Sequence, residues 1–297
     1  MSTSPACYDL CIAGVTLRLH CAAPLPPDPA FEPFLMQGDR PPQCTVQFCP
    51  VQQLPPLPRQ ELHRDVWQRM YACENGVWTR SFLDPPRSSQ PYGVARCDYP
   101  GGRIRVEYLP QGAACVSQWS NSFAHVGFEG VLMQHGRVCF HAALVQTEFG
   151  GILFSGPSGI GKSTQAGLWC RHRAAVQING DRPILARHNG VWTGWGSPYA
   201  GSSRCHVNQS CPIAAVVMLR QAPRCSIRRL PLHQAFRSIY AGLTVYTWDP
   251  AFAAGALDLA VDLAGQVPVY ELSCTPDQAA VQLLEQTLRR DGCSCRT

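Results

Sequence analysis

The chain has 297 residues, of which 45% are apolar and only 15% charged, and it carries a formal net charge of +5. This length allows one large domain or two ordinary ones, and the apolar share is normal for a globular protein. The positive charge is spread along the chain without a basic block, which argues against nucleic acid as a partner. No apolar run has the length of a membrane span, so no membrane partner is expected.

The first five residues lack a charged region followed by an apolar core, so we expect no signal peptide and a cytoplasmic location. The 16 cysteines are scattered without C-x₂-C pairs. In a reducing compartment we expect them to be free thiols rather than disulfides or zinc ligands.

Residues 1–118 are predicted to form a β-rich amino-terminal region. Residues 15–19 alternate apolar and polar side chains, as in a half-buried strand. Asn75-Gly76 lies between two further alternating runs and is a strong signal for a β-hairpin. The region holds no repeat and no group of residues that points to chemistry. Packing, contact within a homo-oligomer and substrate recognition therefore all stay open as its role.

Residues 119–297 are predicted to form an α/β domain. Residues 120–135 carry an apolar stripe typical of one helix, which Gly136 can end. Residues 138–145 predict a strand that contains His141, and a short turn joins it to the apolar run 151–155. We expect these two strands to be antiparallel neighbours because so few residues separate them.

Directly after this second strand, nine residues fit the phosphate-loop pattern G-x-x-x-x-G-K-[ST] at every fixed position. Glycines allow the backbone to turn its N–H groups toward phosphate oxygens. Lys162 can place an ammonium on the outer phosphates, and Ser163 can offer its hydroxyl to Mg²⁺. The helix expected to follow adds its positive N-terminal dipole. The nucleotide-binding residues are thus predicted to be Gly156, Pro157, Ser158, Gly159, Ile160, Gly161, Lys162, Ser163 and Thr164.

Lys162 is the only lysine in the chain, since the other 24 of the 25 basic residues are arginine. A planar guanidinium fork cannot replace a compact ammonium inside a loop that wraps one phosphate group. The retention of lysine at this one position therefore supports the phosphate-loop interpretation.

The acidic partner of such a loop usually follows the next strand, and Asp181 lies just beyond the short strand predicted at residues 175–178. One helix and one strand return the chain to the loop, so Asp181 is predicted to lie beside it in a parallel layer. It can serve as a ligand of Mg²⁺ or as the base for an attacking hydroxyl, or it is a simple turn residue. Arg182 can stabilise charge on the transferred phosphoryl group, or it merely caps the end of a strand. His141 is either a core histidine or part of the site.

Beyond the site, residues 183–187 and 191–195 flank Asn189-Gly190 and predict a second hairpin. Residues 213–219 and 267–272 predict strands, and residues 232–240 and 251–264 predict helices. Thr275, followed by proline, is the predicted N-cap of a final helix that runs to about residue 290.

The segment His141-Ala142-Ala143, the phosphate-loop motif and Asn179-Gly180-Asp181 together resemble the kinase domain of HPr kinase/phosphorylase. The resemblance covers residues 137–205 well and the rest of the carboxyl-terminal part loosely. It implies a phosphate-loop fold shared with phosphoenolpyruvate carboxykinase, here with a β-rich amino-terminal part. Asp181-Arg182-Pro183 and Gly196-Ser197-Pro198-Tyr199 are similar to the smaller relatives that tailor ribosomally made peptides.

The sequence also departs from this family. Gly180 occupies the place of the first Asp of an Asp pair, so only Asp181 can act as base or metal ligand. The Glu-x-Arg-Gly signature of true HPr kinases is absent, which removes the case for HPr as the substrate. Ser202, Ser203 and Arg204 stand where the small relatives commonly have a lysine.

The resemblance implies a kinase that uses ATP and Mg²⁺ to phosphorylate a hydroxyl, with serine of a peptide or protein as the favoured acceptor. Lys162, Asp181, His141 and Arg182 would form the catalytic group, and Ser163 and Asp181 would bind the metal. The alternative is a nucleotide-binding regulator or scaffold of a peptide-biosynthesis pathway with weak catalysis or none, which the single acidic residue favours. A carboxykinase-type reaction is disfavoured because the chain is short and has no second basic cluster.

Overall fold

The computed structural model describes residues 5–38, 40–84 and 88–293, so positions 1–4, where no signal-peptide features were expected, lie outside it. The chain divides into two compact units, each described by itself below. The first comprises Met1–His135 with Thr247–Asp249, and the second comprises Gly136–Tyr246 with Pro250–Thr297. The boundary follows residue 135, whereas the sequence analysis placed it after residue 118.

The first unit is built on an eight-stranded sheet in the order β1-β2-β3-β8-β7-β6-β5-β4. Neighbouring strands are antiparallel except that β3 runs parallel to both β2 and β8. The alternation predicted at residues 15–19 is confirmed, because every second side chain along β2 is buried. The strands are β1 Ala6–Ile12, β2 Val15–Cys21, β3 Cys44–Pro50, β4 Glu61–Arg64, β5 Gln68–Glu74, β6 Val77–Asp84, β7 Ser88–Asp98 and β8 Arg103–Tyr108.

Both hairpins predicted from Asn-Gly pairs are present. Glu74 pairs with Val77 across the first turn, where Asn75 and Gly76 have φ angles of 51° and 81°. The second turn has the same backbone, with φ angles of 50° at Asn189 and 81° at Gly190. Positive φ at both central residues gives the turn the twist that two antiparallel strands need.

The single helix predicted at residues 120–135 is two helices, α2 Trp119–Val126 and α3 Phe128–Gln134. The helix is interrupted at Gly127, which has a φ angle of 62°. A Cβ at this position would overlap the Arg80 guanidinium. Helix α2 packs on the first unit, because the Phe123 ring lies 4.9 Å from that of Phe31. These contacts explain why residues 119–135 belong to the amino-terminal unit. The shorter helices of this unit are η1 Glu32–Phe34, η2 Pro110–Gly112 and α1 Ala113–Val116.

Acid is expected to destabilise the first unit through His125, which is only 3% exposed. Its ring contacts the Asn121 carbonyl and the Tyr92 hydroxyl, and burial lowers the pKa of His125 from 6.5 to about 4. The neutral imidazole therefore stabilises the fold fully above pH 6.5, and this contribution of about 3 kcal/mol is lost as the pH falls to 4.

Urea unfolding between pH 7 and pH 4 measures this loss, with His125→Gln as the comparison because its side chain does not titrate. The variant is expected to be less stable than the wild type at pH 7 and to depend less on pH. Equal pH slopes in the two proteins would contradict the role of His125.

The second unit has a nine-stranded sheet in which β12-β10-β11-β15-β14-β13-β9 follow in order. Strand β17 also pairs with β15, and β16 pairs with β17. Strands β11, β15 and β17 are parallel, while the other pairs are antiparallel. The strands are β9 Val138–Cys139, β10 Ala142–Thr147, β11 Gly150–Ser155, β12 Val176–Asn179, β13 Ile184–His188, β14 Val191–Trp195, β15 Ser210–Gln221, β16 Ser226–Arg229 and β17 Val269–Cys274.

Two expectations for this sheet need correction. The strand predicted at residues 138–145 is two strands, β9 on β13 and β10 on β11, and the chain changes partner at Phe140 and His141. Strand β12 does not lie directly beside β11 in a parallel layer, because antiparallel β10 lies between them. The predicted antiparallel pairing of β10 with β11 is confirmed.

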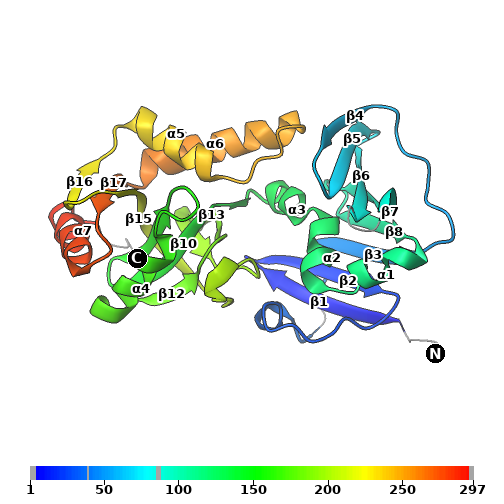
Figure 1. The fold of residues 1–297 in the computed structure, drawn as a ribbon, viewed down its shortest axis with the longest axis horizontal. Helices are drawn as coiled ribbons and strands as arrows, with labels where there is room; N and C mark the ends of the chain where they lie inside the picture. The colour runs from blue at the N-terminus through cyan, green and yellow to red at the C-terminus, as the bar shows by residue number, and fades with distance from the viewer. Residues whose placement is uncertain (1–4, 39, 85–87, 294–297) are drawn as a thin grey trace. The chain divides into compact units, whose positions relative to one another are not determined.

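Helices α4 Lys162–Arg173 and α7 Gln278–Arg290 contact each other and cover one face of this sheet (Figure 1). Trp169 of α4 and Leu284 of α7 join alternate residues of the central strands, such as Phe154 and Val217, in one buried core. This packing holds α4 firmly at the end of β11. The other helices of the unit are η3 Gly201–Ser203, α5 Leu232–Gly242 and α6 Pro250–Gln266.

The last helix begins later than predicted. Its N-cap is Asp277, whose Oδ1 accepts from the N–H groups of Ala279 and Ala280, and Thr275 instead donates its hydroxyl to the Asp277 carboxylate. The carboxylate is the stronger cap because it is charged and lies at the positive end of the helix dipole.

All 15 cysteines of the described residues are free thiols. Among the same residues, no helix is both long and apolar enough to cross a membrane.

Candidate active site

The strand and helix that the phosphate-loop motif requires lie on either side of it. Strand β11 ends at Ser155 and α4 begins at Lys162. Gly156, Gly159 and Gly161 have φ angles of 144°, 78° and 112°. Residues other than glycine rarely adopt this region of backbone conformation. The glycines of the motif therefore serve the backbone conformation of the loop. The N-terminus of α4 points its N–H groups toward the space that the loop encloses.

The Lys162 side chain folds back over this loop. It is 8% exposed, and its Nζ donates to the carbonyls of Gly156 at 3.1 Å and Pro157 at 3.2 Å. Burial lowers the pKa of Lys162, and the nearby Asp181 carboxylate opposes that shift. The only lysine ammonium of the chain is thus held where phosphate oxygens could replace two backbone carbonyls as its partners.

His141 and Asp181 form a pair beside the loop, with 3.3 Å between His141 Nε2 and Asp181 Oδ1. Backbone contacts fix both residues. The Ala142 N–H donates to the Asp181 carbonyl at 3.0 Å, and the His141 N–H donates to the Gly242 carbonyl at 2.8 Å. The Ser155 hydroxyl donates to the His141 carbonyl at 2.8 Å, which ties the pair to the strand that enters the loop.

The turn that carries Asp181 and Arg182 is shaped by a fully buried side chain, Asn179. Its Oδ1 accepts from the N–H groups of Asp181 at 3.0 Å and Arg182 at 2.8 Å. Its Nδ2 donates to the Ser197 carbonyl at 3.1 Å, and the Ser197 hydroxyl donates to the Arg182 carbonyl at 2.6 Å. Asn179 and Ser197 both stand within the sequence motifs, but the motifs did not indicate that these side chains position the turn. The tendency of Asn to accept from the backbone two residues on was the available signal.

Arg182 reaches toward the same carboxylate and is held from the other side by Thr244. Arg182 Nε lies 3.7 Å from Asp181 Oδ2, and Arg182 Nη1 donates to the Thr244 hydroxyl at 2.8 Å. Thr244 follows α5, and its own N–H donates to the Cys139 carbonyl at 3.0 Å. Nothing in the sequence pattern pointed to Thr244, because its partners lie far away along the chain.

Burial and the neighbouring cations favour the neutral form of the His141 imidazole by lowering its pKa. Burial lowers the pKa of His141 most, the cations Lys162 and Arg182 lower it further, and Asp181 acts in the opposite direction. A neutral imidazole can accept a hydrogen bond or a proton. Lys162, Asp181 and Arg182 thus lie close enough to His141 to affect its pKa, so the residues predicted to form one catalytic group lie together.

The predicted metal ligands are less closely connected. Ser163 and Thr164 lie exposed on the first turn of α4. No hydrogen bond joins Ser163 to Asp181, and the described part of the chain holds no group of three or more His, Cys, Asp or Glu side chains suited to a metal ion. The donor set of one hydroxyl and one carboxylate fits Mg²⁺ that keeps water and phosphate oxygens as further ligands.

Gly180 leaves no room for a second aspartate in this turn. A Cβ at Gly180 would overlap both Oγ and Cβ of Ser203 and lie 3.0 Å from the Ala200 carbonyl oxygen. The Ser203 hydroxyl is fixed in place, since it donates to the Ala200 carbonyl at 2.6 Å and accepts from the Cys205 N–H at 3.2 Å. The two departures from the family, at residue 180 and at residues 202–204, are therefore connected. Ser203 fills the space that a side chain at residue 180 would need.

We expect Gly180→Ala to destabilise the protein by about 1–3 kcal/mol, the usual effect of forcing a group into filled space. Gly180→Ala with Ser203→Gly should recover most of this loss because the overlapping atoms are gone. Thermal and urea unfolding measure both. Gly167→Ala in α4 is the matched control, since its Cβ would meet nothing within 4 Å. A single variant as stable as the wild type would show that Ser203 moves aside freely.

Comparisons with known proteins add little to this geometry. No protein-family model matches the chain, and no curated protein matches it. Among solved structures, the HPr(Ser) kinase/phosphatase from Coxiella burnetii matches at a TM-score of 0.30 and 15% identity, covering 52% of this chain and 89% of that one. A TM-score this low does not establish a common fold, so the family resemblance stays a prediction.

Proposed function

We propose that this protein transfers the terminal phosphoryl group of Mg·ATP to a hydroxyl group, with serine of a peptide or protein as the favoured acceptor. The observation that supports it is the His141–Asp181 pair at 3.3 Å beside a glycine-rich loop that carries the only lysine. The choice of serine rests on the sequence resemblance alone.

Each residue of the site has a distinct role in binding or transfer. Lys162 and the backbone N–H groups of residues 156 and 158–164 bind the phosphates, since Pro157 has no N–H to donate. Ser163 supplies an oxygen ligand for Mg²⁺, which would neutralise charge on the phosphates when bound. Asp181 is either a second ligand of Mg²⁺ or the base of the transfer step. Arg182 lies beside the carboxylate and is available to the negative charge that spreads over the transferred group.

In the transfer step, the acceptor oxygen forms a bond to the γ-phosphorus while the bond from that phosphorus to the β–γ bridging oxygen breaks. ADP leaves with that bridging oxygen. Asp181 takes the proton of the acceptor hydroxyl, and neutral His141 holds the carboxylate in position through its Nε2. Such a small set is sufficient because phosphoryl transfer depends mostly on positioning and charge neutralisation.

Transfer of label from γ-³²P-ATP to synthetic peptides tests the proposal. Peptides that contain serine should become labelled in the presence of Mg²⁺, and matched peptides with alanine in its place should not. Chelation of Mg²⁺ should abolish the labelling.

The lack of a second carboxylate at Gly180 favours the alternative of a nucleotide-binding regulator. That alternative predicts that ATP binds while no hydroxyl acceptor is labelled, so the same assay, run beside a measurement of ATP binding, distinguishes the two.

A further inference from the structure

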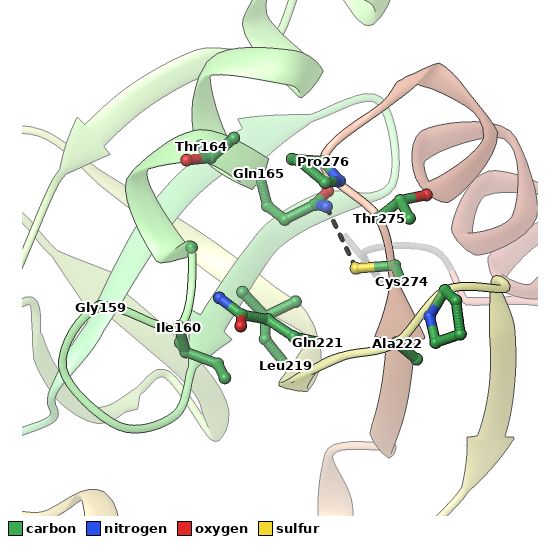
Figure 2. Close-up of a pocket in the computed structure, with 12 residues that line it drawn as sticks. Gly159, Ile160, Thr164, Gln165, Leu219, Gln221, Ala222, Cys274, Thr275 and Pro276 are labelled. Carbon is green, nitrogen blue, oxygen red and sulfur yellow. Dashed lines mark hydrogen bonds between the residues drawn. The ribbon is translucent and has the colours of Figure 1, made fainter.

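A cavity of about 400 Å³ adjoins the glycine-rich loop, and neither His141 nor Asp181 lines it. One wall consists of Gly159, Ile160 and the first turns of α4, and the facing walls come from the ends of β15 and β17 with the turns that follow them (Figure 2). All of these elements belong to the second unit.

The position of the cavity follows from the sheet. Strand β15 runs parallel to β11 on one side and to β17 on the other, so the carboxyl ends of all three strands lie at one edge. Strand β11 leads into the glycine-rich loop, and β15 and β17 end at the cavity. The crevice outside the carboxyl ends of neighbouring parallel strands is where α/β sheets bind ligands.

The lining of the cavity suits a flat heteroaromatic group. Ile160, Leu219, Ala222 and Pro276 give it a largely apolar wall, and a few polar side chains face it as well. Apolar walls with a small number of placed polar groups, at a volume of several hundred Å³, are typical of sites for small organic ligands.

Gln165 provides the independent sign of a ligand. Its side chain is 2% exposed and extends from α4 toward Cys274, where Nε2 donates to Sγ at 3.3 Å (Figure 2). Its Oε1 is buried at the cavity wall and has no hydrogen-bond partner among the described residues. Buried carbonyl oxygens are rarely left without a donor, because their desolvation is then not compensated.

We propose that this cavity binds the base of the nucleotide and that Gln165 selects adenine over guanine. The inference rests on the proposed function for the placement of the phosphates in the neighbouring loop. The exocyclic amino group of adenine is a donor that satisfies Gln165 Oε1. Guanine presents a carbonyl oxygen at the same position, and two acceptors would then face each other while the Gln165 amino group stays on Cys274.

Calorimetric binding of three probes with Mg²⁺ present tests this assignment: ATP, GTP and inorganic tripolyphosphate. Tripolyphosphate reports the loop without the base. The wild type should bind ATP at least about tenfold more tightly than GTP or tripolyphosphate, as expected for one matched hydrogen bond plus burial of the base.

Two variants separate the base from the phosphates. Ala222→Phe fills the cavity from an outer turn and should weaken ATP binding about tenfold or more, while tripolyphosphate binds as before. Ala254→Phe on the exposed side of α6 is the matched control and should change neither. Gln165→Leu should bring the affinities for ATP and GTP close together, again with tripolyphosphate unchanged.

Equal binding of ATP and tripolyphosphate by the wild type, or equal weakening of both by Ala222→Phe, would overturn the assignment while leaving the phosphate loop intact. A preference for GTP would overturn the role of Gln165. Failure of all three probes to bind would instead refute the proposed function, and the base site with it.

Discussion

Replacing Lys162 by alanine is expected to reduce phosphoryl transfer by a factor on the order of 10²–10³, the usual effect of removing one preorganised charge from a developing anion. Among the residues that the structure describes, the ammonium has the Gly156 and Pro157 carbonyls as its hydrogen-bond partners, so it is placed to bind phosphate rather than to support the fold. Binding of Mg·tripolyphosphate should weaken with it. Lys162→Met, which keeps the apolar stem, serves as the control for stability in thermal unfolding.

Lys162→Arg keeps the charge and distinguishes geometry from electrostatics. A guanidinium is larger than an ammonium and planar, whereas the Lys162 ammonium is a compact group that lies 3.1–3.2 Å from two carbonyl oxygens. We therefore expect the arginine variant to be nearly as inactive as the alanine variant. Substantial activity with arginine would show that the site needs only a positive charge.

The presence of a single lysine also allows a direct chemical measurement. Lys162 and the chain's amino terminus carry the only primary amines that an amine-acylating reagent can convert to stable amides, since the chain has no other lysine. Mass spectrometry of the peptide that contains Lys162 then reports its accessibility, and bound Mg·ATP is expected to slow its acylation. Equal acylation with and without nucleotide would contradict a contact between Lys162 and phosphate.

The parts of the site that the sequence predicted are those encoded by neighbouring residues. The motif of Gly156 to Thr164 fixes both the types and the spacing of its residues, and the strand and helix on either side follow from local apolar patterns. The two Asn-Gly hairpins are equally local, because their central residues set the turn by their own backbone preferences.

The parts that could not be predicted depend on contacts between distant residues. The strand around His141 breaks because the Phe140 N–H donates to the Pro183 carbonyl and the His141 N–H to the Gly242 carbonyl. The clash that excludes a side chain at Gly180 comes from Ser203. No periodicity in the neighbouring sequence records such partners. The same holds for Gly127, where Arg80 of the sheet fills the space that a Cβ would need.

These long-range contacts are the ones that shape the candidate site. Asn179 and Ser197 hold the turn of Asp181, and the Asp181 carbonyl in turn accepts from the strand of His141. The pair is therefore built into the sheet by backbone hydrogen bonds rather than by its own contact of 3.3 Å. A substitution that changes only the charge of the carboxylate should leave this framework in place.

Asp181→Asn is that substitution, and we expect it to lower phosphoryl transfer by a factor on the order of 10²–10⁴, the usual contribution of a positioned general base. Asparagine has the same shape, so the hydrogen bonds of the Asp181 backbone to Asn179 and Ala142 remain. Binding of ATP should be nearly unchanged, because the phosphates are held by the loop and Lys162. Transfer of label to a serine peptide and calorimetric binding of ATP measure the two effects separately.

The dependence of transfer on Mg²⁺ concentration decides which role Asp181 has. If Asp181 acts as the base, the variant loses rate at saturating Mg²⁺ and keeps the wild-type Mg²⁺ affinity. If it binds the metal, a higher Mg²⁺ concentration is needed and part of the rate returns when it is supplied. Asp258→Asn on the exposed side of α6 is the matched control and should alter neither quantity. Full transfer activity in Asp181→Asn would contradict both roles and would leave His141 as the remaining candidate for the base.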